Sequence, residues 1–529
     1  MMRDSSFVII RSVVAVSLLA GLALAPAGPG TTVFAVPVIV LAVVAGLSFL
    51  RGPAGGAARV GICILFLTMA ILKIADTGAA RAYGRAFDPL VDMGLLPAAW
   101  NLARGTLGTA SAAAILAGVV IALSLATGLL FWALGGPARL GRRTRRAALA
   151  VALVLLGVVG VSRLAGWGGL PVGTPAADYI AAHIQRSLAT RAELLAFNRQ
   201  LATDPLADLP AETRFAALAG QDVMLWFVES YGQNALYDPR YAATVRRRLD
   251  QVGADLDTAG LHAKSAWLVS PTYGGMSWLA HGALLSGLWT NNQSRYDTMI
   301  QSDRASLNRL FREAGWTTIA AVPAIVEDWP EADYFGFDAV YDARRLGYRG
   351  RRFNWVTMPD QFTLNRVRQI VGELDQPAMV EASLISSHAP WTPIPHLVDW
   401  EAIDDGHIFD PQALAGDSPQ TVWADPARVR RQYLKSIDYV WATLGQYMRR
   451  YGDDTVFIIL GDHQAAPIVS GARRDYRVPI TVVAADPSVM DRLDDKYWQP
   501  GLVPDESLAA RGMDQFREAF TRAMSGPVE

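Results

Sequence analysis

Long apolar runs occupy the first third of the chain. Five of them are each near the length of about 20 residues that a helix needs to cross a bilayer, at residues 7–24, 32–50, 60–75, 111–134 and 147–164. The third is the weakest, because it ends at Lys73 and Asp76. The first resembles a secretory signal, but four more runs follow it, which favours an uncleaved first span. We therefore expect five transmembrane helices within residues 1–166.

Arginines gather in two of the loops between these runs. Five lie between the fourth and fifth runs and two flank the loop between the second and third: Arg139, Arg142, Arg143, Arg145, Arg146, Arg51 and Arg59. Short loops rich in arginine stay on the cytoplasmic side of a membrane. With five spans, the chain after the fifth span lies outside. We therefore expect a multi-pass protein of the bacterial cytoplasmic (inner) membrane, whose main domain faces the periplasm or the cell exterior.

Two connecting segments precede the main domain. Residues 81–104 mix apolar and charged side chains, and we expect there either a helix in the membrane interface or a plain connecting loop. Residues 167–220 are rich in alanine, leucine, arginine and glutamate at helical spacing, which predicts a linker of one or two amphipathic helices.

From residue 221 to residue 529, apolar strand-like runs alternate with helical stretches. This alternation predicts an α/β domain with a largely parallel central sheet flanked by helices. The chain as a whole is therefore expected to be a membrane-anchored α/β protein. In sheets of this kind, ligands bind beyond the carboxyl ends of the strands.

Composition narrows the choice of partners. A chain of 529 residues is longer than one hydrophobic core usually supports, in agreement with separate units. The net charge of −1 argues against a nucleic-acid partner, which would select a basic surface. Cys63 is the only cysteine, so neither an intrachain disulfide nor a cysteine-based metal site is possible.

Polar residues follow three of the strand-like runs. The run at 223–228 ends in Glu229, and the run at 455–460 leads into Asp462 and His463. A weaker run at 379–385, interrupted by Glu381, leads to His388. Each residue alone reads as a capping or surface group. Their joint occurrence at strand ends favours one functional site.

A serine stands between a strand and a helix in the stretch 270–287. The strand-like run at 266–269 is followed by Gly274 and Gly275, then by Ser277, and then by a run of small residues that ends at Gly287. This pattern predicts a serine at a helix N-terminus, where free N–H groups favour a phosphate or sulfate group. The alternative is a tight turn with an N-cap. The three strand ends favour Ser277 as a nucleophile.

Glu229, Asp462 and His463, with Ser277 as a fourth ligand, suit one divalent cation, either zinc, manganese or magnesium. The cation matters because a serine hydroxyl is a weak nucleophile at neutral pH, and coordination lowers its pKa. His388 is then free to hold the phosphate or to pass a proton to the leaving oxygen.

From about residue 221 onward the chain resembles the alkaline phosphatase and sulfatase superfamily. With its anchor, it is similar to the lipoteichoic acid synthases and the related phosphoglycerol and phosphoethanolamine transferases. Four motifs carry the resemblance: SWLAHGALLSG at 277–287, VESYG at 228–232, GDH at 461–463 and SHAPW at 387–391. In those relatives the equivalents of Glu229, Ser277, Asp462 and His463 bind one metal ion, and the nucleophile is transiently esterified.

Departures from the family pattern refine this expectation. The residues after Ser277 lack the Pro and Ser of the sulfatase signature, and His281 replaces its Arg, so conversion of the nucleophile to an aldehyde is not expected. No histidine follows His463, which favours one metal ion over two. Trp329 matches a substrate-binding tryptophan of the family, and Glu331 falls where the family has an arginine, which favours a cationic headgroup such as ethanolamine. His281 and Tyr273 are further substrate-site candidates.

These observations predict a transferase that moves a phospho-headgroup from a membrane phospholipid, through an ester on Ser277, to a glycan or lipid acceptor outside the cytoplasm. One alternative is a membrane-bound phosphodiesterase or sulfatase that uses water as the acceptor. Another is a non-catalytic descendant that only binds at the membrane, because fold alone does not guarantee activity.

Overall fold

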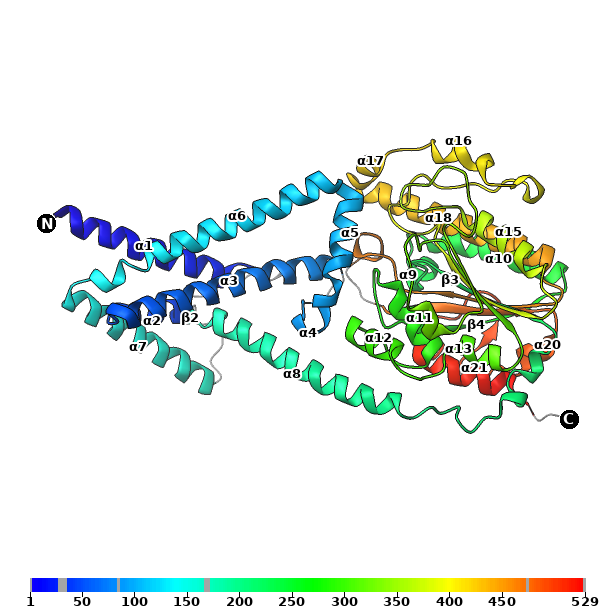
Figure 1. Cartoon of the computed structure of the whole chain (residues 1–529), viewed down its shortest axis with the longest axis horizontal. Coiled ribbons are helices and arrows are strands. Elements are labelled where there is room, and N and C mark those ends of the chain that lie inside the picture. The colour runs from blue at the N-terminus through cyan, green and yellow to red at the C-terminus, as the bar shows by residue number, and fades with distance from the viewer. Residues whose placement is uncertain (1, 27–35, 83–85, 166–171, 472–474, 527–529) are drawn as a thin grey trace. The chain divides into compact units, whose positions relative to one another are not determined.

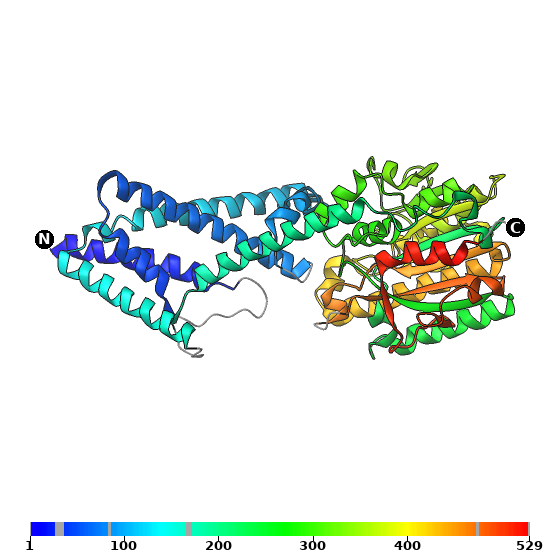
Figure 2. The same ribbon diagram turned by 90° about the horizontal axis from the view of Figure 1, so that it is seen from below.

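The structure, a computed structural model, describes residues 2–26, 36–82, 86–165, 172–471 and 475–526. The chain divides into two compact units, Met1–Glu193 and Leu194–Glu529. The division falls within helix α8 (Pro175–Leu201), which can be followed in Figure 1 and Figure 2. The predicted domain boundaries at residues 166 and 220 stay predictions, and residue 166 lies outside the described residues.

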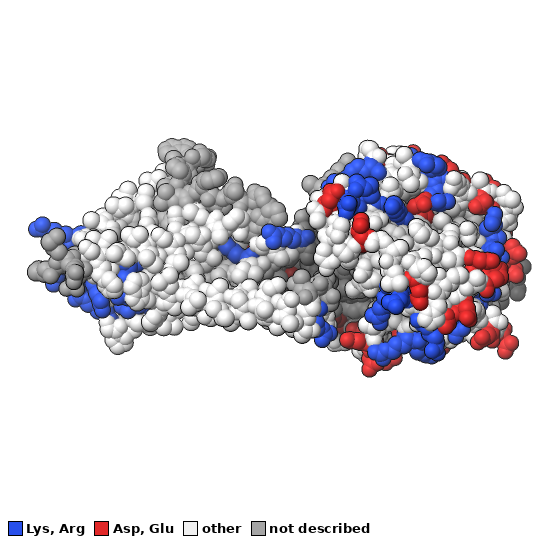
Figure 3. All heavy atoms as spheres, turned by 90° about the horizontal axis from the view of Figure 1, so that it is seen from above, with Lys and Arg blue, Asp and Glu red and all other residues white. Residues whose placement is uncertain are grey.

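Within the described residues, unit 1 has four helices long and apolar enough to cross a membrane: Ser6–Leu24, Gly52–Arg81, Thr109–Arg139 and Arg142–Leu164. They belong to α1 (Met2–Leu24), α3 (Gly52–Ala82), α6 (Thr109–Ala133) with the turn after it, and α7 (Arg142–Leu164). In Figure 3 the surface of unit 1 is mostly free of charge colours. Exposed apolar surface of this extent requires lipid around it, so this unit is a membrane anchor.

The second predicted span does not form a helix of membrane-crossing length among the described residues. Helix α2 (Val38–Leu47) is apolar but has 10 residues, and residues 32–35 of the predicted run lie outside the described residues. The third run, in contrast, is longer than predicted, because α3 continues through Asp76 to Ala82. Burial of Asp76 is compensated within unit 1, where its carboxylate accepts a hydrogen bond from Tyr179 at 2.5 Å and pairs with His183 at 3.0 Å.

The two arginine-bearing loops lie together in unit 1. Arg145, in the first turn of α7, donates from Nη1 to the Ser48 carbonyl at 3.0 Å, and its guanidinium lies 5.5 Å from the ring centre of Phe49. Ser48 and Phe49 directly follow α2 and precede Arg51. The segment 81–104, between α3 and α6, consists mainly of the short helices α4 (Pro89–Asp92) and α5 (Leu96–Leu107), and residues 83–85 in it lie outside the described residues.

Unit 2 contains a nine-stranded sheet among its described residues, in the order β10-β4-β9-β8-β3-β7-β5-β6, with β11 also paired to β4. The strands are β3 (Asp222–Val228), β4 (His262–Val269), β5 (Thr317–Val322), β6 (Ala339–Asp342), β7 (Ala378–Leu384), β8 (Thr455–Gly461), β9 (Arg477–Ala484), β10 (Gln499–Pro500) and β11 (Ala510–Gly512). Five neighbouring strands, from β8 to β6, are parallel, whereas β9 is antiparallel to both β8 and β4. The prediction of a largely parallel sheet is therefore confirmed.

Helices cover both faces of this sheet (Figure 1). Successive residues of a strand point to opposite faces, and β3 shows both packings. Trp226 contacts Tyr447 of α18 (Pro426–Tyr451) with ring centres 5.3 Å apart, whereas Phe227 stacks on His281 of α11 (Ser277–Ser286) at 3.7 Å. Because both faces are covered, the central strands are continuously apolar, which is why they were visible in the sequence.

The register of the parallel strands brings their carboxyl ends to one edge of the sheet. Val228 pairs with Leu384 of β7 on one side and with Gly461 of β8 on the other. The residue after Val228 is Glu229, the residue after Gly461 is Asp462, and the chain after β7 leads to His388. Residues far apart in the sequence therefore meet by register alone.

Asp360, the first residue of α15 (Asp360–Val371), is fully buried behind this edge. Its Oδ1 accepts hydrogen bonds from the backbone N–H groups of Ile385 and Ser386 at 2.8 and 3.0 Å, while Oδ2 is buried without a partner. Burial raises the pKa of Asp360 from 3.8 to about 7, more than these bonds lower it. The folded protein therefore binds a proton here more tightly than the unfolded chain.

This buried carboxyl predicts a dependence of stability on pH. Asp360 contributes stability below about pH 4, and this contribution, on the order of 4 kcal/mol at most, is lost as pH rises through about 7. Asp360→Asn is expected to remove the part of the stability loss at rising pH that comes from Asp360. The measurement is the thermal unfolding midpoint of the detergent-solubilised chain from pH 4 to pH 8. Identical pH dependence in the variant and the wild-type protein would contradict the assignment.

Candidate active site

Three predicted ligands meet beyond the ends of β3 and β8. Glu229, Asp462 and His463 each place one ligand atom within 4.8 Å of those of the other two, and all three are buried. His463 Nε2 lies 3.4 Å from Glu229 Oε1 and 3.6 Å from Asp462 Oδ2. The polar atoms of three residues that are far apart in the chain thus converge on one point.

The backbone around these residues fixes the orientation of the carboxylates. Asp462 Oδ1 accepts hydrogen bonds from the N–H groups of Ser230 and His463 at 2.8 and 2.6 Å, which leaves Oδ2 on the side of the imidazole. Ser230 has a positive φ of 59°, and its hydroxyl donates to Glu229 Oε1 at 2.8 Å. A left-handed residue other than glycine is strained by roughly 1–3 kcal/mol, and here it directs both carboxylates inward.

The imidazole of His463 is oriented in the same way. Its Nδ1 lies 2.7 Å from the carbonyl oxygen of Gln464, an acceptor, so Nδ1 carries the hydrogen. Nε2 then faces the two carboxylates and would offer its lone pair to a cation bound among them. A backbone carbonyl on the far nitrogen is a common way in which proteins orient a metal-binding histidine.

Ser277 joins the three ligands from the first turn of α11. Its Oγ donates a hydrogen bond to Glu229 Oε2 at 2.9 Å and lies 3.2 Å from His463 Nε2. The chain reaches it through Gly274, Gly275 and Met276, with φ of 75°, 148° and 63°. Three left-handed residues in succession turn the strand sharply into the helix, and the partly buried serine begins that helix, whose N-terminus favours an anion.

The charges of the cluster are unbalanced. Burial raises the pKa of Glu229, but His388 and His463 outweigh burial and hold this pKa well below its ordinary value. Burial, with repulsion from Glu229, raises the pKa of Asp462 to about 7. Burial lowers the pKa of His463, but Asp462 and Glu229 raise it to about 9. Protons on Asp462 and His463 therefore supply the positive charge that a divalent cation would otherwise supply. The two carboxylates, one imidazole and one hydroxyl are a donor set that fits such a cation.

A cavity of about 400 Å³ opens beside Ser277. Glu229, Asp462, Ser277 and two further histidines, His281 and His388, line it together with aromatic side chains: Trp278, Tyr296, Trp329, Phe335, Trp355 and Trp391. A few polar groups converging within an otherwise apolar cavity are typical of a substrate site.

The two histidines of the cavity are held differently. His388 Nδ1 lies 2.5 Å from the carbonyl oxygen of Ala389, and its ring stacks on Trp355 with centres 3.8 Å apart. His281 Nδ1 lies 3.0 Å from Glu381 Oε1, and its ring stacks on Phe227. Of the two, His281 has a carboxylate partner.

Of the two remaining substrate-site candidates, Trp329 lines the cavity and Tyr273 does not. Trp329 lines the cavity, with its ring centre 5.9 Å from that of Phe335. Tyr273 is buried, its hydroxyl shares a hydrogen bond of 2.6 Å with Ser470, and it is not among the residues that line the cavity.

Several residues of the cavity were not among the sequence candidates. Trp278 and Trp355 lack any signal in a single sequence, because an exposed tryptophan has no periodic pattern. Glu381 did have a signal in the sequence, because it is a carboxylate that interrupts an otherwise apolar strand. A buried charge is costly unless it is paired, so such a residue needs a partner.

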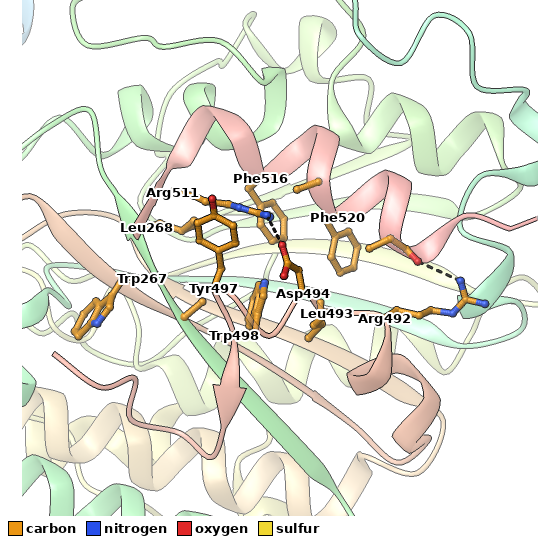
Figure 4. Close-up of a pocket in the computed structure, with 13 residues that line it drawn as sticks. Trp267, Leu268, Arg492, Leu493, Asp494, Tyr497, Trp498, Arg511, Phe516 and Phe520 are labelled. Atoms are coloured by element: carbon orange, nitrogen blue, oxygen red, sulfur yellow. Dashed lines mark hydrogen bonds and ion pairs between the residues drawn. The ribbon is translucent and has the colours of Figure 1, made fainter. Parts of the chain in front are cut away.

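A second cavity, of about 180 Å³, lies between β4 and α21 (Phe516–Met524) (Figure 4). Its walls are largely apolar, with Trp498, Phe516 and Phe520 drawn around it. Beside it Arg511 forms an ion pair of 3.0 Å with Asp494, and Arg492 donates to the Ala523 carbonyl at 3.2 Å. None of the ligand candidates lines it, so the chemistry belongs to the larger cavity.

A serine at a helix N-terminus thus lies beside a buried group of side chains that could hold a metal ion, at the carboxyl ends of a parallel sheet. The family model described as Sulfatase matches residues 248–480, which include Ser277, His388, Asp462 and His463. The chain therefore carries a sulfatase-family domain over these residues.

Solved structures with some similarity include three transferases. Lipoteichoic acid synthase LtaP from Listeria monocytogenes is 14% identical, covering 61% of this chain and 75% of its own, with a TM-score of 0.37. Phosphoglycerol transferase GacH from Streptococcus pyogenes, in complex with sn-glycerol-1-phosphate, is 12% identical over 63% and 81%, with a TM-score of 0.36. The periplasmic domain of phosphoethanolamine transferase EptC from Campylobacter jejuni is 9% identical over 56% and 87%, also at 0.36. The search of curated proteins finds no match.

Proposed function

We propose that this protein transfers a phospho-headgroup, of the phosphoglycerol or phosphoethanolamine type, from a membrane phospholipid to a glycan or lipid acceptor outside the cytoplasm. The observation that carries the proposal is the position of Ser277 Oγ, 2.9 Å from Glu229 and 3.2 Å from His463 at the opening of a helix N-terminus. The membrane anchor and the motif resemblance to lipoteichoic acid synthases support a lipid donor.

The reaction has two displacements at phosphorus. In the first, Ser277 gives up its hydroxyl proton to solvent and Oγ forms a bond to phosphorus, while the bond from phosphorus to the diacylglycerol oxygen breaks and that oxygen leaves with a proton. In the second, an acceptor hydroxyl loses its proton as it forms the new bond to phosphorus, and Ser277 Oγ leaves and regains a proton. A divalent cation bound by Glu229, Asp462 and His463 would lower the pKa of the serine hydroxyl and offset charge on the phosphoryl group.

The remaining cavity residues position the substrate. The free N–H groups at the start of α11 are placed for non-bridging phosphate oxygens. His388 is fixed in its plane by Trp355 and by the Ala389 carbonyl, and the protonated ring would donate a hydrogen bond from Nε2 to the phosphate. Trp329 offers an aromatic surface to the headgroup, which suits a cationic group such as ethanolamine.

The anchor places this chemistry at a lipid surface. The contact between Arg145 and Ser48 brings the two arginine-bearing loops together, which supports a common cytoplasmic side for them. Unit 2 then faces the periplasm or the cell exterior. A donor site next to the bilayer spares the enzyme from extracting a lipid into water.

The test is the fate of a labelled phospholipid given to the full chain in proteoliposomes with a divalent cation. We expect release of diacylglycerol and a phospho-headgroup adduct on the peptide that contains Ser277, whose mass names the headgroup. Quantitative appearance of free headgroup phosphate, with no modified acceptor in a glycan-supplemented reaction, would assign the protein to hydrolysis. Neither diacylglycerol release nor an adduct with any anionic or zwitterionic phospholipid would overturn the proposal.

A further inference from the structure

Glu381 is a carboxylate inside the sheet. It lies in β7 between β3 and β5, where it pairs with Leu225 and Ala320, and it is 2% exposed. An ionised carboxylate in such a place costs several kcal/mol unless it is paired. Its two oxygens have separate partners, since Oε1 lies 3.0 Å from His281 Nδ1 and Oε2 accepts from Asn308 Nδ2 at 3.3 Å.

His281 connects this buried carboxylate to the cavity. It lies four residues after Ser277, hence on the same side of α11 one turn further on, with Cβ atoms roughly 5–6 Å apart. Its ring is held flat against Phe227, with centres 3.7 Å apart and planes at 14°. The side chain remains 15% exposed and lines the cavity that Ser277 opens into.

The carboxylate decides which nitrogen of His281 is available. Because Glu381 accepts from Nδ1, this nitrogen keeps its hydrogen, and Nε2 is the atom that can gain or lose a proton. Nε2 has no hydrogen-bond partner among the described residues. The His388 ring, in contrast, has a neutral carbonyl oxygen at Nδ1, whereas the Nδ1 of His281 is held by a carboxylate.

We propose that His281 carries the proton of both displacements and that Glu381 is its positioning residue; this inference rests on the proposed transfer reaction. In the first displacement, the bond from phosphorus to the diacylglycerol oxygen breaks, and that oxygen takes the proton from Nε2 of the imidazolium. In the second, Nε2 of the neutral imidazole takes the proton of the acceptor hydroxyl as it attacks phosphorus. The ring ends as it began, and Nδ1 keeps its hydrogen bond to Glu381 throughout.

Other charged and titratable groups around His281 belong to several elements. Glu381 contributes from β7, Tyr296 from α12 (Gln293–Ile300), and Glu229, Asp462 and His463 from the ends of β3 and β8. A pH profile alone would mix these groups. The test therefore varies the leaving group as well.

The decisive comparison uses two donors on the full chain in detergent micelles. A phospholipid has an alkoxide leaving group that needs a proton, whereas a p-nitrophenyl phosphodiester releases a phenolate that needs none. In a single turnover, which reports the first displacement alone, His281→Asn is expected to slow release from the phospholipid by roughly 10²–10³-fold and release of nitrophenolate by less than about 5-fold. Equal losses with both donors would overturn the role of His281 in proton transfer.

Glu381→Gln tests the positioning residue. In a single turnover it is expected to slow release from the phospholipid by roughly 10-fold or more and to spare the nitrophenyl donor, because the imidazole loses the carboxylate that orients it. Asn308→Ala is the matched control, since it removes the other hydrogen bond of the same carboxylate. Equal losses in Glu381→Gln and Asn308→Ala with both donors, at equal thermal midpoints, would assign Glu381 to packing.

Failure of this inference is distinct from failure of the proposed function. Ser277→Ala is expected to abolish turnover of both donors, because it removes the attacking oxygen. If it does so while His281→Asn affects both donors alike, the transfer reaction stands and the proton carrier is another group. If Ser277→Ala leaves both activities intact, the proposed function itself is wrong.

Discussion

Ser277→Ala is expected to lower the rate of diacylglycerol release from phospholipid by roughly 10³-fold or more, and to abolish the covalent adduct. The physical reason is local. The Oγ atom is the group that stands at the start of α11 within hydrogen-bond distance of both Glu229 and His463, and alanine removes it without changing the backbone. The measurement is single-turnover release from labelled lipid, with the adduct read by intact mass.

Ser277→Thr is the matched control, because it keeps a hydroxyl on the same carbon and adds one methyl group. It is expected to retain measurable release and to form an adduct heavier by that methyl group. Both variants should unfold at temperatures close to that of the wild-type protein, because Ser277 is partly buried and is the first residue of its helix. Wild-type rates of release in Ser277→Ala would show that another oxygen attacks phosphorus.

Much of this site could be predicted because its parts follow strands that are apolar along their whole length. The run at 223–228 corresponds to β3 (Asp222–Val228) and the run at 455–460 to β8 (Thr455–Gly461). Once both are read as parallel neighbours, Glu229 and Asp462 must emerge at one edge. The turn before Ser277 was equally visible, because consecutive glycines mark a backbone that needs positive φ.

Pairings between distant segments could not be predicted in this way. His281 and Glu381 are 100 positions apart, and nothing in the periodicity of either segment specifies the other. The antiparallel strand β9, between β4 and β8, is likewise set by tertiary packing and reads in the sequence like any other apolar run. In unit 1 the apolar content of the second run was clear, but composition does not determine helix length, and α2 has 10 residues.

Glu229→Gln is expected to weaken binding of the divalent cation by roughly 100-fold or more, and with it to abolish lipid turnover at micromolar metal. The substitution keeps the shape of the side chain but removes one of the two carboxylates that surround His463 Nε2, with Oε1 at 3.4 Å. It also replaces one of the two oxygens that accept hydrogen bonds from Ser230 and Ser277 with an NH2 donor. Zn²⁺, Mn²⁺ and Mg²⁺ are each added to metal-depleted protein, and the rise in thermal midpoint and the bound metal per chain are measured.

In the wild-type protein, a cation at 100 times its dissociation constant stabilises the fold by about 2.7 kcal/mol, which the thermal midpoint reports. Glu229→Gln should lose most of this rise at the same metal concentration. Asp360→Asn is the matched control, since it also neutralises a fully buried carboxyl near the strand ends but one that lies outside the ligand cluster. The Asp360→Asn variant should keep the metal-dependent rise in thermal midpoint. Equal rises in Glu229→Gln and the wild-type protein would place the cation elsewhere, and Ser277 would then lack the group that activates it.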